Sequence, residues 1–380
     1  MWKGDEMAKR LLLCVLAATL ALGCIFATSK RKLEKRYAEG LVRFDQSDLE
    51  KAGLGILWEQ SLGGGVDGRR DRKNKVDVVG AYLYEDTILI TTEQKVIYAL
   101  DRKERRLEWV TIVPEPVRIA PTFFDRRYYA AGGRELIVVD SKGTTTVVGE
   151  FPTSIAVPVL VTDDYIYAVG ADGTVHKLDK TRLLEVWPAP ARTEGVILGT
   201  PVEVADLLVF GVSTGELIGV DKLGGGRRLD VMGLGQIMGG PVTDGKFIYF
   251  GSADFYAYCY TTLETEVWRQ LVEGKVMTTP VLSGETLLVE TLRAGLVALD
   301  KKDGHELWRN GGIGKFAATD GKVLFGVGAD KELIFADATQ NKTFSRVDIS
   351  GFDIVPRNTF GDGLVYLVSK DGRVACLKAK

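Results

Sequence analysis

The strongest catalytic motif in the sequence is Gly-Val-Ser-Thr-Gly at residues 211–215, which matches the G-x-S-x-G pattern of hydrolase nucleophiles. That chemistry needs a strand-turn-helix elbow, with a His and an acid placed to activate the Ser. The segment instead aligns with residues 170–173 and 251–254, which read as hairpins between strands. The chain has only two histidines, His176 and His305. We therefore expect no catalytic residues.

Metal and cofactor sites have equally little support. Past the N-terminal region only Cys259 and Cys376 remain, and neither is in a Cys-x-x-Cys arrangement, so burial as small hydrophobic residues is favoured. The Gly-rich residues 233–240 lack a surrounding βαβ unit, which favours close backbone passage over dinucleotide binding. Asp163 and Asp164 precede a strand, where turns use Asp for local hydrogen bonds. We expect no metal and no cofactor.

The global charge gives no reason to expect nucleic acid as a partner. The formal net charge is −2, so no excess of Lys and Arg exists to displace phosphate counterions. The 44 Gly and 13 Tyr, with many Val, Ile and Thr, favour short strands joined by tight turns. The composition indicates an all-β protein.

An internal repeat of about forty residues organises the chain, and such a period is typical of propeller blades. Each copy ends in an apolar strand, usually closed by Asp. The eight copies end at Asp101, Asp140, Asp179, Asp221, Tyr260, Asp300, Asp337 and Lys378. The fold class we predict is an all-β, eight-bladed β-propeller.

The same parts recur in order within each copy. A Pro marks the entry to the innermost strand at Pro121, Pro158, Pro201, Pro241 and Pro280. A tight turn such as Asp172-Gly173, Thr214-Gly215 or Asp371-Gly372 joins the second strand to the third. The fourth strand tends to carry a Trp, at Trp109, Trp187, Trp268 and Trp308. We expect these indoles to pack between neighbouring blades.

The two ends of the repeat array indicate how the ring closes. Residues 57–62, around Trp58, read as a fourth strand with no blade before it, and the last copy ends after its third strand. The N-terminal strand is thus expected to complete the last blade, which removes two exposed sheet edges. We expect the propeller to span residues 55–380.

The N-terminus has the layout of an export signal, with Lys9 and Arg10 before an apolar run over residues 11–22. The run closes in Leu-Ala-Leu-Gly-Cys, which resembles a bacterial lipobox with Cys24 as the lipid-attachment residue. We expect a lipoprotein-type signal peptide at residues 1–23 and a partly helical tether at 24–54. Ordinary cleavage near residue 23 and an uncleaved anchor are the alternatives. Ile25 is not the Asp associated with inner-membrane retention, which favours the outer membrane. The basic loop 68–75 reads as solvated, with an anionic ligand as the alternative.

Residues 296–308, Leu-Val-Ala-Leu-Asp-Lys-Lys-Asp-Gly-His-Glu-Leu-Trp, resemble the pyrroloquinoline-quinone (PQQ)-type propeller repeat, and the resemblance covers roughly residues 57–380. One branch of that superfamily, the quinoprotein alcohol dehydrogenases, holds the quinone and calcium beside a vicinal cysteine pair, which this chain lacks. The other branch, the BamB-type lipoproteins of the outer-membrane β-barrel assembly machinery, is similar in length, signal, eight repeats and clasping Trp strand. The second fits better.

This resemblance implies a non-catalytic, lipid-anchored scaffold on the periplasmic face of the outer membrane. Its expected partners are proteins of the β-barrel assembly machinery or of another envelope complex. Residence in the periplasm or an inner-membrane anchor is the alternative location. A periplasmic PQQ-dependent oxidoreductase and a generic envelope-complex interaction module are the alternative functions.

BamB-type proteins contact the barrel-forming subunit through an Arg and an acidic pair just before the Pro that enters blades four and five. The matching positions here are uncharged: Val196, Gln236 and Met238. The candidate partner-binding residues are therefore an uncharged rim, for which buried packing is the alternative at each position. They are Val196, Ile197, Gln236, Ile237 and Met238.

Overall fold

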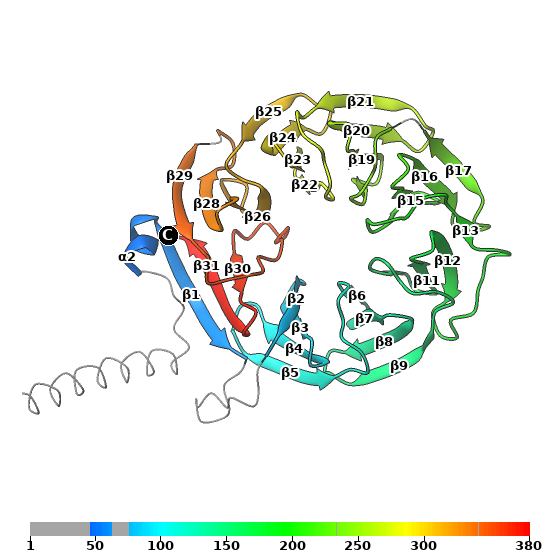
Figure 1. Cartoon of the computed structure of the whole chain (residues 1–380), viewed down its shortest axis with the longest axis horizontal. Helices are drawn as coiled ribbons and strands as arrows, with labels where there is room; N and C mark the ends of the chain where they lie inside the picture. The colour runs from blue at the N-terminus through cyan, green and yellow to red at the C-terminus, as the bar shows by residue number, and fades with distance from the viewer. Residues whose placement is uncertain (1–45, 63–75, 233, 341) are drawn as a thin grey trace, which may run out of the picture.

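The computed structural model describes residues 46–62, 76–232, 234–340 and 342–380. Its strands form eight antiparallel sheets arranged radially around a central opening (Figure 1). This is the predicted eight-bladed β-propeller. The blades are numbered 1 to 8 in chain order.

Seven blades are four-stranded, with strands in sequence order from the centre outwards. Blade 1 has β2 (Val78–Leu83), β3 (Thr87–Thr92), β4 (Val96–Asp101) and β5 (Leu107–Ile112). Blade 2 has β6 (Thr122–Phe124), β7 (Arg127–Gly132), β8 (Glu135–Asp140) and β9 (Thr145–Glu150). Blade 3 has β10 (Leu160–Val161), β11 (Tyr165–Val169), β12 (Thr174–Asp179) and β13 (Ala191–Arg192). Blade 4 has β14 (Val202–Val204), β15 (Leu207–Gly211), β16 (Leu217–Asp221) and β17 (Arg227–Val231).

The other blades continue the same order around the ring. Blade 5 has β18 (Val242–Thr243), β19 (Phe247–Gly251), β20 (Tyr256–Thr261) and β21 (Glu266–Leu271). Blade 6 has β22 (Val281–Ser283), β23 (Thr286–Thr291), β24 (Gly295–Asp300) and β25 (Glu306–Asn310). Blade 7 has β26 (Lys315–Thr319), β27 (Val323–Val327), β28 (Glu332–Asp337) and β29 (Thr343–Asp348).

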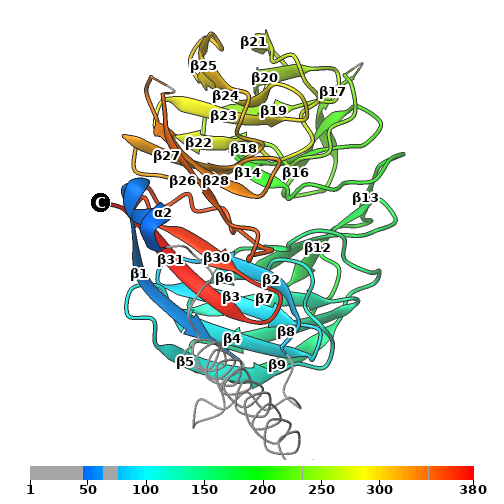
Figure 2. The ribbon, with the colours of Figure 1, turned by 60° about the vertical axis from the view of Figure 1, so that its left-hand side comes forward.

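Blade 8 is closed by the N-terminal strand, as predicted. Its sheet consists of β30 (Val365–Val368), β31 (Arg373–Ala379) and β1 (Leu54–Ser61), and β1 pairs antiparallel with β31. Figures 1 and 2 both show β1 lying along β31 at the outside of the ring. Blade 8 has no regular innermost strand, because only an isolated bridge between Ile354 and Val368 occupies that place.

The recurrent Trp residues join consecutive blades. The indole Nε1 of Trp58, Trp187 and Trp268 donates to the carbonyl oxygen of Arg102, Lys222 and Lys301 on the next blade, at 3.1, 3.2 and 3.0 Å. The rings of Trp187 and Trp268 also lie so close to Gly225 and Gly304 that a Cβ there would strike them. The expectation that these indoles pack between blades is confirmed.

The fourth strand of blade 3 differs from the prediction. Trp187 precedes β13, and only an isolated bridge between Leu178 and Glu185 pairs this region with β12. Pro188 and Pro190 follow directly, and a proline cannot donate a backbone hydrogen bond to a neighbouring strand. The strand is therefore interrupted, while the indole keeps its contact with blade 4.

A short helix, α2 (Gln46–Lys51), precedes β1. Leu49 and Ala52 are buried among residues of blades 7 and 8, such as Val347 and Phe352. No helix in the described ranges is both long and apolar enough to cross a membrane. Cys24, the signal peptide 1–23, the tether up to residue 45 and the basic loop 68–75 lie outside the described residues.

Candidate partner-binding face

One face of the ring is formed by two kinds of loop, and we call it the rim face. It contains the connections that run from the outermost strand of one blade to the innermost strand of the next, and the hairpins between second and third strands. Backbone hydrogen bonds tie the two together at successive blades: Ser213 N donates to Val196 O, Ala253 N to Gln236 O, and Leu292 N to Lys275 O, at 2.9 to 3.0 Å. Val196, Gln236 and Lys275 are thus equivalent positions at the entries to blades 4, 5 and 6.

The structure divides the five predicted site residues into two groups. Ile197 and Ile237 are 0% exposed and belong to the apolar cores between blades 3 and 4 and between blades 4 and 5. Val196 is 41% exposed, Gln236 is exposed and Met238 is half-buried. Three of the five residues are therefore available to a partner.

Close backbone packing positions these connections. A Cβ on Gly199 would collide with the backbone of Gly240, and one on Gly239 would collide with the backbone of Thr278. The entries to blades 4, 5 and 6 therefore pass each other backbone to backbone around the opening. The prediction that the Gly-rich segment provides close passage into blade 5 is confirmed for its described residues.

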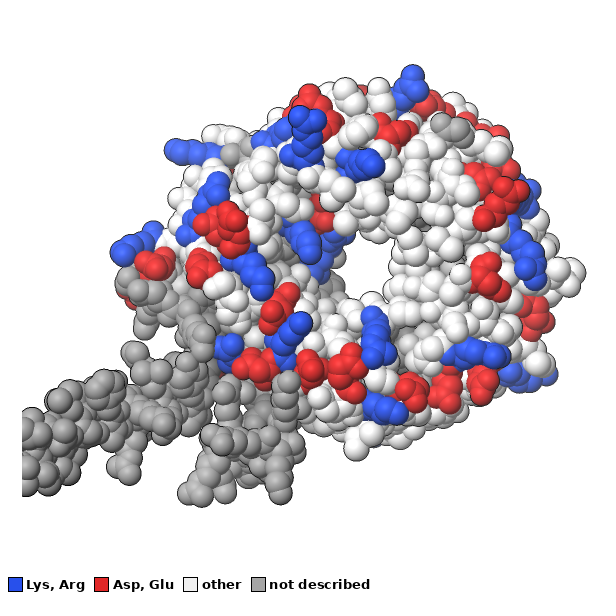
Figure 3. All heavy atoms as spheres, viewed as in Figure 1, with Lys and Arg blue, Asp and Glu red and all other residues white. Residues whose placement is uncertain are grey.

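Sequence reasoning missed further exposed apolar side chains on the same face. Leu198, next to Ile197, is 46% exposed, and Met232, between β17 and Gln236, is 67% exposed. Neither had a signal in the sequence, because alternation of apolar residues ends where the strands end and loop exposure depends on packing. Figure 3 shows the face of the ring that is turned to the viewer in Figure 1. Charged side chains of both signs lie around the ring, and the surface beside the opening near β11 to β19 is largely uncharged.

The Ser of the G-x-S-x-G motif is a turn residue. Ser213 lies between β15 and β16, and its Oγ accepts a hydrogen bond from Val196 N at 3.0 Å. The positive φ of Gly215 closes this hairpin. No His contacts Ser213 among the described residues, because the hydrogen-bond partners of His176 and His305 lie elsewhere. The segment holds the rim together rather than forming a nucleophile elbow.

A second arrangement has the order of a hydrolase triad. His176 Nδ1 lies 2.6 Å from Glu185 Oε2, and its Nε2 lies 2.9 Å from Thr174 Oγ1. However, Thr174 is 2% exposed and donates its hydroxyl proton to Asp172 Oδ1 at 2.6 Å, a bond that lowers the pKa of Asp172. The hydroxyl is both inaccessible and committed to a carboxylate. These bonds instead secure β12 where β13 is short.

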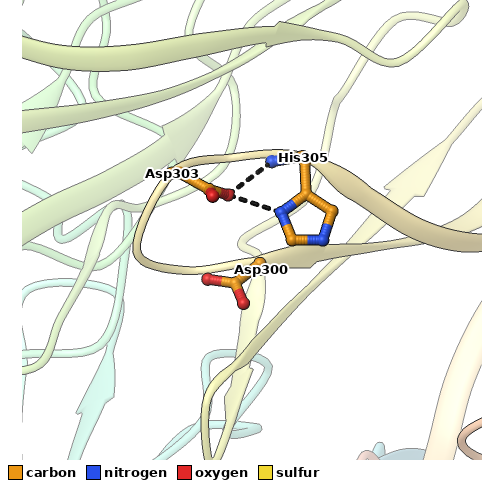
Figure 4. A group of neighbouring side chains, drawn as sticks. All are labelled: Asp300, Asp303 and His305. Carbon is orange, nitrogen blue, oxygen red and sulfur yellow. Dashed lines mark hydrogen bonds and ion pairs between the residues drawn. The ribbon is translucent and has the colours of Figure 1, made fainter.

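The described residues contain one group with metal-ligand atoms close together, Asp300, Asp303 and His305 (Figure 4). Asp303 Oδ1 accepts from His305 N at 3.1 Å and lies 2.6 Å from His305 Nδ1, which raises the pKa of His305. Asp300 Oδ1 accepts from Lys302 N at 2.8 Å. The same Asp-capped turn follows the third strand in other blades, as at Asp140 and Asp221. The group is explained by turn formation.

Neither described cysteine is available for redox chemistry. Cys259 and Cys376 are free and 0% exposed, and burial raises the pKa of each thiol to about 12. The thiolate is the reactive form. Both residues therefore act as small core side chains, as the sequence predicts.

The one buried carboxylate among the described residues is held by hydrogen bonds to neighbouring blades. Glu290, on β23, is the one Asp or Glu buried among the described residues. Its Oε1 accepts from Phe316 N at 2.9 Å and from Arg357 Nη2 at 2.7 Å, and its Oε2 accepts from Thr278 Oγ1 at 2.9 Å. This carboxylate links blades 6, 7 and 8, and both of its oxygens accept hydrogen bonds from the protein.

Comparison with known proteins agrees with the fold. The family model described as "Outer membrane protein assembly factor BamB" matches residues 124–310. No curated protein matches the chain.

Two solved structures show the same architecture. The crystal structure of BamB from Moraxella catarrhalis has a TM-score of 0.67 at 17% identity, and the match covers 86% of this chain and 98% of that one. The computationally designed Ika8 protein has a TM-score of 0.66 at 14% identity, covering 83% and 98%. At these identities the likeness establishes the fold, and a designed protein that matches equally well underlines that function must be argued from the site.

Proposed function

We propose that this chain, an eight-bladed propeller that is similar to BamB over residues 124–310 and in its fold, is a non-catalytic scaffold that binds partner proteins through its rim face. The observation that carries the proposal is the rim itself. At equivalent entries to blades 4 and 5, Val196 and Gln236 are presented on loops that hairpin hydrogen bonds and backbone contacts hold rigidly. Rigid loops with exposed apolar side chains suit protein recognition.

The remaining chemistry-bearing groups support a scaffold over an enzyme. The motif Ser, the imidazole chain at His176 and the Asp-capped turns all use their polar atoms inside the fold. A catalytic group must reach a substrate, whereas these groups stabilise turns and strand edges.

A quinone cofactor with calcium does not fit the described residues. Calcium needs several oxygen ligands, and the one buried carboxylate among the described residues, Glu290, is already paired with Arg357 and accepts from Thr278 and the Phe316 amide. Cys259 and Cys376 lie in different blades, blade 5 and blade 8, so they form no vicinal pair. No reaction step is derived through this cofactor.

We place the scaffold on the periplasmic face of the outer membrane, anchored by lipid on Cys24. The Leu-Ala-Leu-Gly-Cys sequence at residues 20–24 and the resemblance to BamB-type lipoproteins support this placement. On the same grounds, the proposed partners are proteins of the outer-membrane β-barrel assembly machinery.

A pull-down of the tagged full-length chain from solubilised envelope tests the function. We expect stoichiometric recovery of an outer-membrane assembly protein, and reduced recovery with Val196→Glu and Gln236→Glu, because each introduces a charge at the proposed contact. The matched control is Leu223→Glu, which alters a side chain 87% exposed on the opposite face. Recovery that never includes an assembly protein would overturn this partner, and stoichiometric quinone and calcium in the purified protein would overturn the scaffold.

A further inference from the structure

A groove opens on the rim face where blade 5 meets blade 6. Its volume is about 620 Å³, and its walls come from the hairpin between β19 and β20, the end of β21, the hairpin between β23 and β24, and β25. The lining residues are Phe255, Leu271, Glu273, Arg293, Ala294, Arg309 and Gly311. It lies one blade beyond the predicted positions at the entries to blades 4 and 5.

Large apolar side chains are exposed at this groove. Phe255 is 42%, Leu271 45% and Leu292 72% exposed. Phe255 and Leu271 share the groove, and Leu292 precedes Arg293 at its edge. Exposed apolar residues that adjoin one another around a hollow mark an interaction site more strongly than scattered ones do.

The backbone of Phe255 adds a second observation. Its φ is +75°, and the corresponding hairpin positions also have a positive φ, with Gly at Gly173 and Gly215 and Lys at Lys95 and Lys331. A bulky residue with positive φ is unfavourable in a turn that Gly would form without strain. The hairpin conformation thus places the aromatic ring in the lining of the groove.

Three basic side chains lie at or beside the apolar walls of the groove, and they differ in whether an acidic residue of the chain pairs with them. Arg309 is engaged by two carboxylates, with Glu273 at 2.6 Å and Glu306 at 2.7 Å. Lys275 and Arg293 are exposed, and neither has an acidic partner among the described residues. Their backbone segments are adjacent, because Leu292 N donates to Lys275 O at 3.0 Å. The groove therefore has apolar walls with Arg293 in its lining, and Lys275 lies on the adjoining segment.

We propose that this groove receives an acidic segment of the partner protein, which inserts one apolar side chain between Phe255 and Leu271 and sets its carboxylates against Lys275 and Arg293. Charge complementarity selects this occupant, since a basic segment would meet unpaired like charges. Lys275 is equivalent to Val196 and Gln236, so the contact extends the rim face by one blade. The inference rests on the proposed function, because it assumes a protein partner.

Site-specific photo-crosslinking in the intact envelope tests the location. A photo-reactive phenylalanine analogue replaces Phe255 in the full-length chain, and its matched control replaces Leu263, which is 82% exposed in the hairpin at the other end of blade 5. We expect a protein adduct from position 255 alone, with the crosslinked peptide rich in Asp and Glu. Equal adducts from position 263, adducts to lipid, or a basic crosslinked peptide would each overturn the inference.

Charge reversal tests the chemistry. Lys275→Glu combined with Arg293→Glu is expected to reduce partner recovery about tenfold, since two attractive surface pairs become repulsive. The matched control is Lys103→Glu combined with Lys302→Glu, two exposed cations in turns of the opposite face. Far-UV circular dichroism and the thermal midpoint check that both variants fold.

The outcomes separate this inference from the proposed function. If the unaltered chain recovers an assembly protein and the reversed variant recovers it equally well, the groove is wrong and the scaffold stands. If the unaltered chain recovers no envelope protein, both fail.

Discussion

At the scale of single residues, the polar atoms of the repeat serve the turns. The Asp that ends the third strand accepts backbone N–H groups of the following turn in several blades. The pairs are Asp140 with Lys142 and Thr144, Asp221 with Leu223 and Gly224, and Asp337 with Thr339 and Gln340. These recurrent carboxylates are thus structural, and each accepts its bonds more strongly while it is ionised.

The ionisation of these carboxylates makes stability depend on acid. Backbone hydrogen bonds from Thr144 and Lys142 lower the pKa of Asp140, and a hydrogen bond from the backbone N–H of Gln340 lowers the pKa of Asp337. A lowered folded-state pKa adds stability that is complete above the unfolded pKa of about 3.9 and is lost as pH falls through the folded pKa. We therefore expect the thermal unfolding midpoint to fall as the pH drops below about 4.

The control for this effect is Asp140→Asn, which keeps an acceptor oxygen but removes the titration. The variant should start from a lower midpoint at pH 7 and lose less on acidification than the unaltered chain. Parallel curves for the two proteins would count against the turn carboxylate as the source.

At the scale of elements, the closure between blade 8 and blade 1 has contacts that no other blade junction has in the described residues. Arg102 follows β4, and its side chain is 3% exposed. The guanidinium pairs with Asp362 and donates to the carbonyl oxygens of Tyr84 and Glu85 and to the hydroxyl of Tyr366. The Arg102 carbonyl oxygen receives the Trp58 indole. Arg102 therefore links blade 1 to both parts of blade 8, the N-terminal strand β1 and the C-terminal segment that contains β30.

Arg102→Ala is expected to lower the free energy of unfolding by about 3 kcal/mol, because it leaves buried acceptors unpaired. Loss of one partner of a fully buried ion pair costs about 3 to 5 kcal/mol, and the lower value applies here because Asp362 is partly exposed. The shift in the urea unfolding midpoint measures this loss. Lys103→Ala is the matched control, because its pair with Asp86 is exposed and should contribute less than about 1 kcal/mol. A loss from Arg102→Ala no larger than the control's would show that the closure is not secured here.

At the scale of the whole molecule, stability depends on β1 as the last element of the ring. The apolar cores lie between blades, and the core at the closure joins Trp58 to Tyr366 and Val374 of blade 8 and to Ile88 and Leu100 of blade 1. Without β1, the outer edge of β31 would present unpaired backbone groups.

Deletion of residues 1–62 removes β1 and should give a protein that unfolds at a lower temperature and associates through the β31 edge. Deletion of residues 1–45 retains α2 and β1 and should remain monomeric with an unchanged ring. Light scattering after size-exclusion chromatography distinguishes the two. A monomeric product from the longer deletion would contradict the role of the strand.

The sequence by itself was sufficient for the architecture. Blade number, strand order, Pro entries, the Trp packing and the closure by the Trp58 strand all follow from a local repeat, because each blade is built from contacts among residues close in sequence and from one interface with its neighbour. The interruption before β13 was missed, since it does not repeat.

Exposure on the rim was decided by the tertiary structure alone. Val196 and Ile197 are adjacent apolar residues with indistinguishable sequence signals, yet one is 41% exposed and the other 0%. The groove at Phe255 and the free charges of Lys275 and Arg293 arise because loops from two blades meet there. A strand pattern specifies which face of a sheet is buried, but which loop residues stay accessible depends on how neighbouring blades pack.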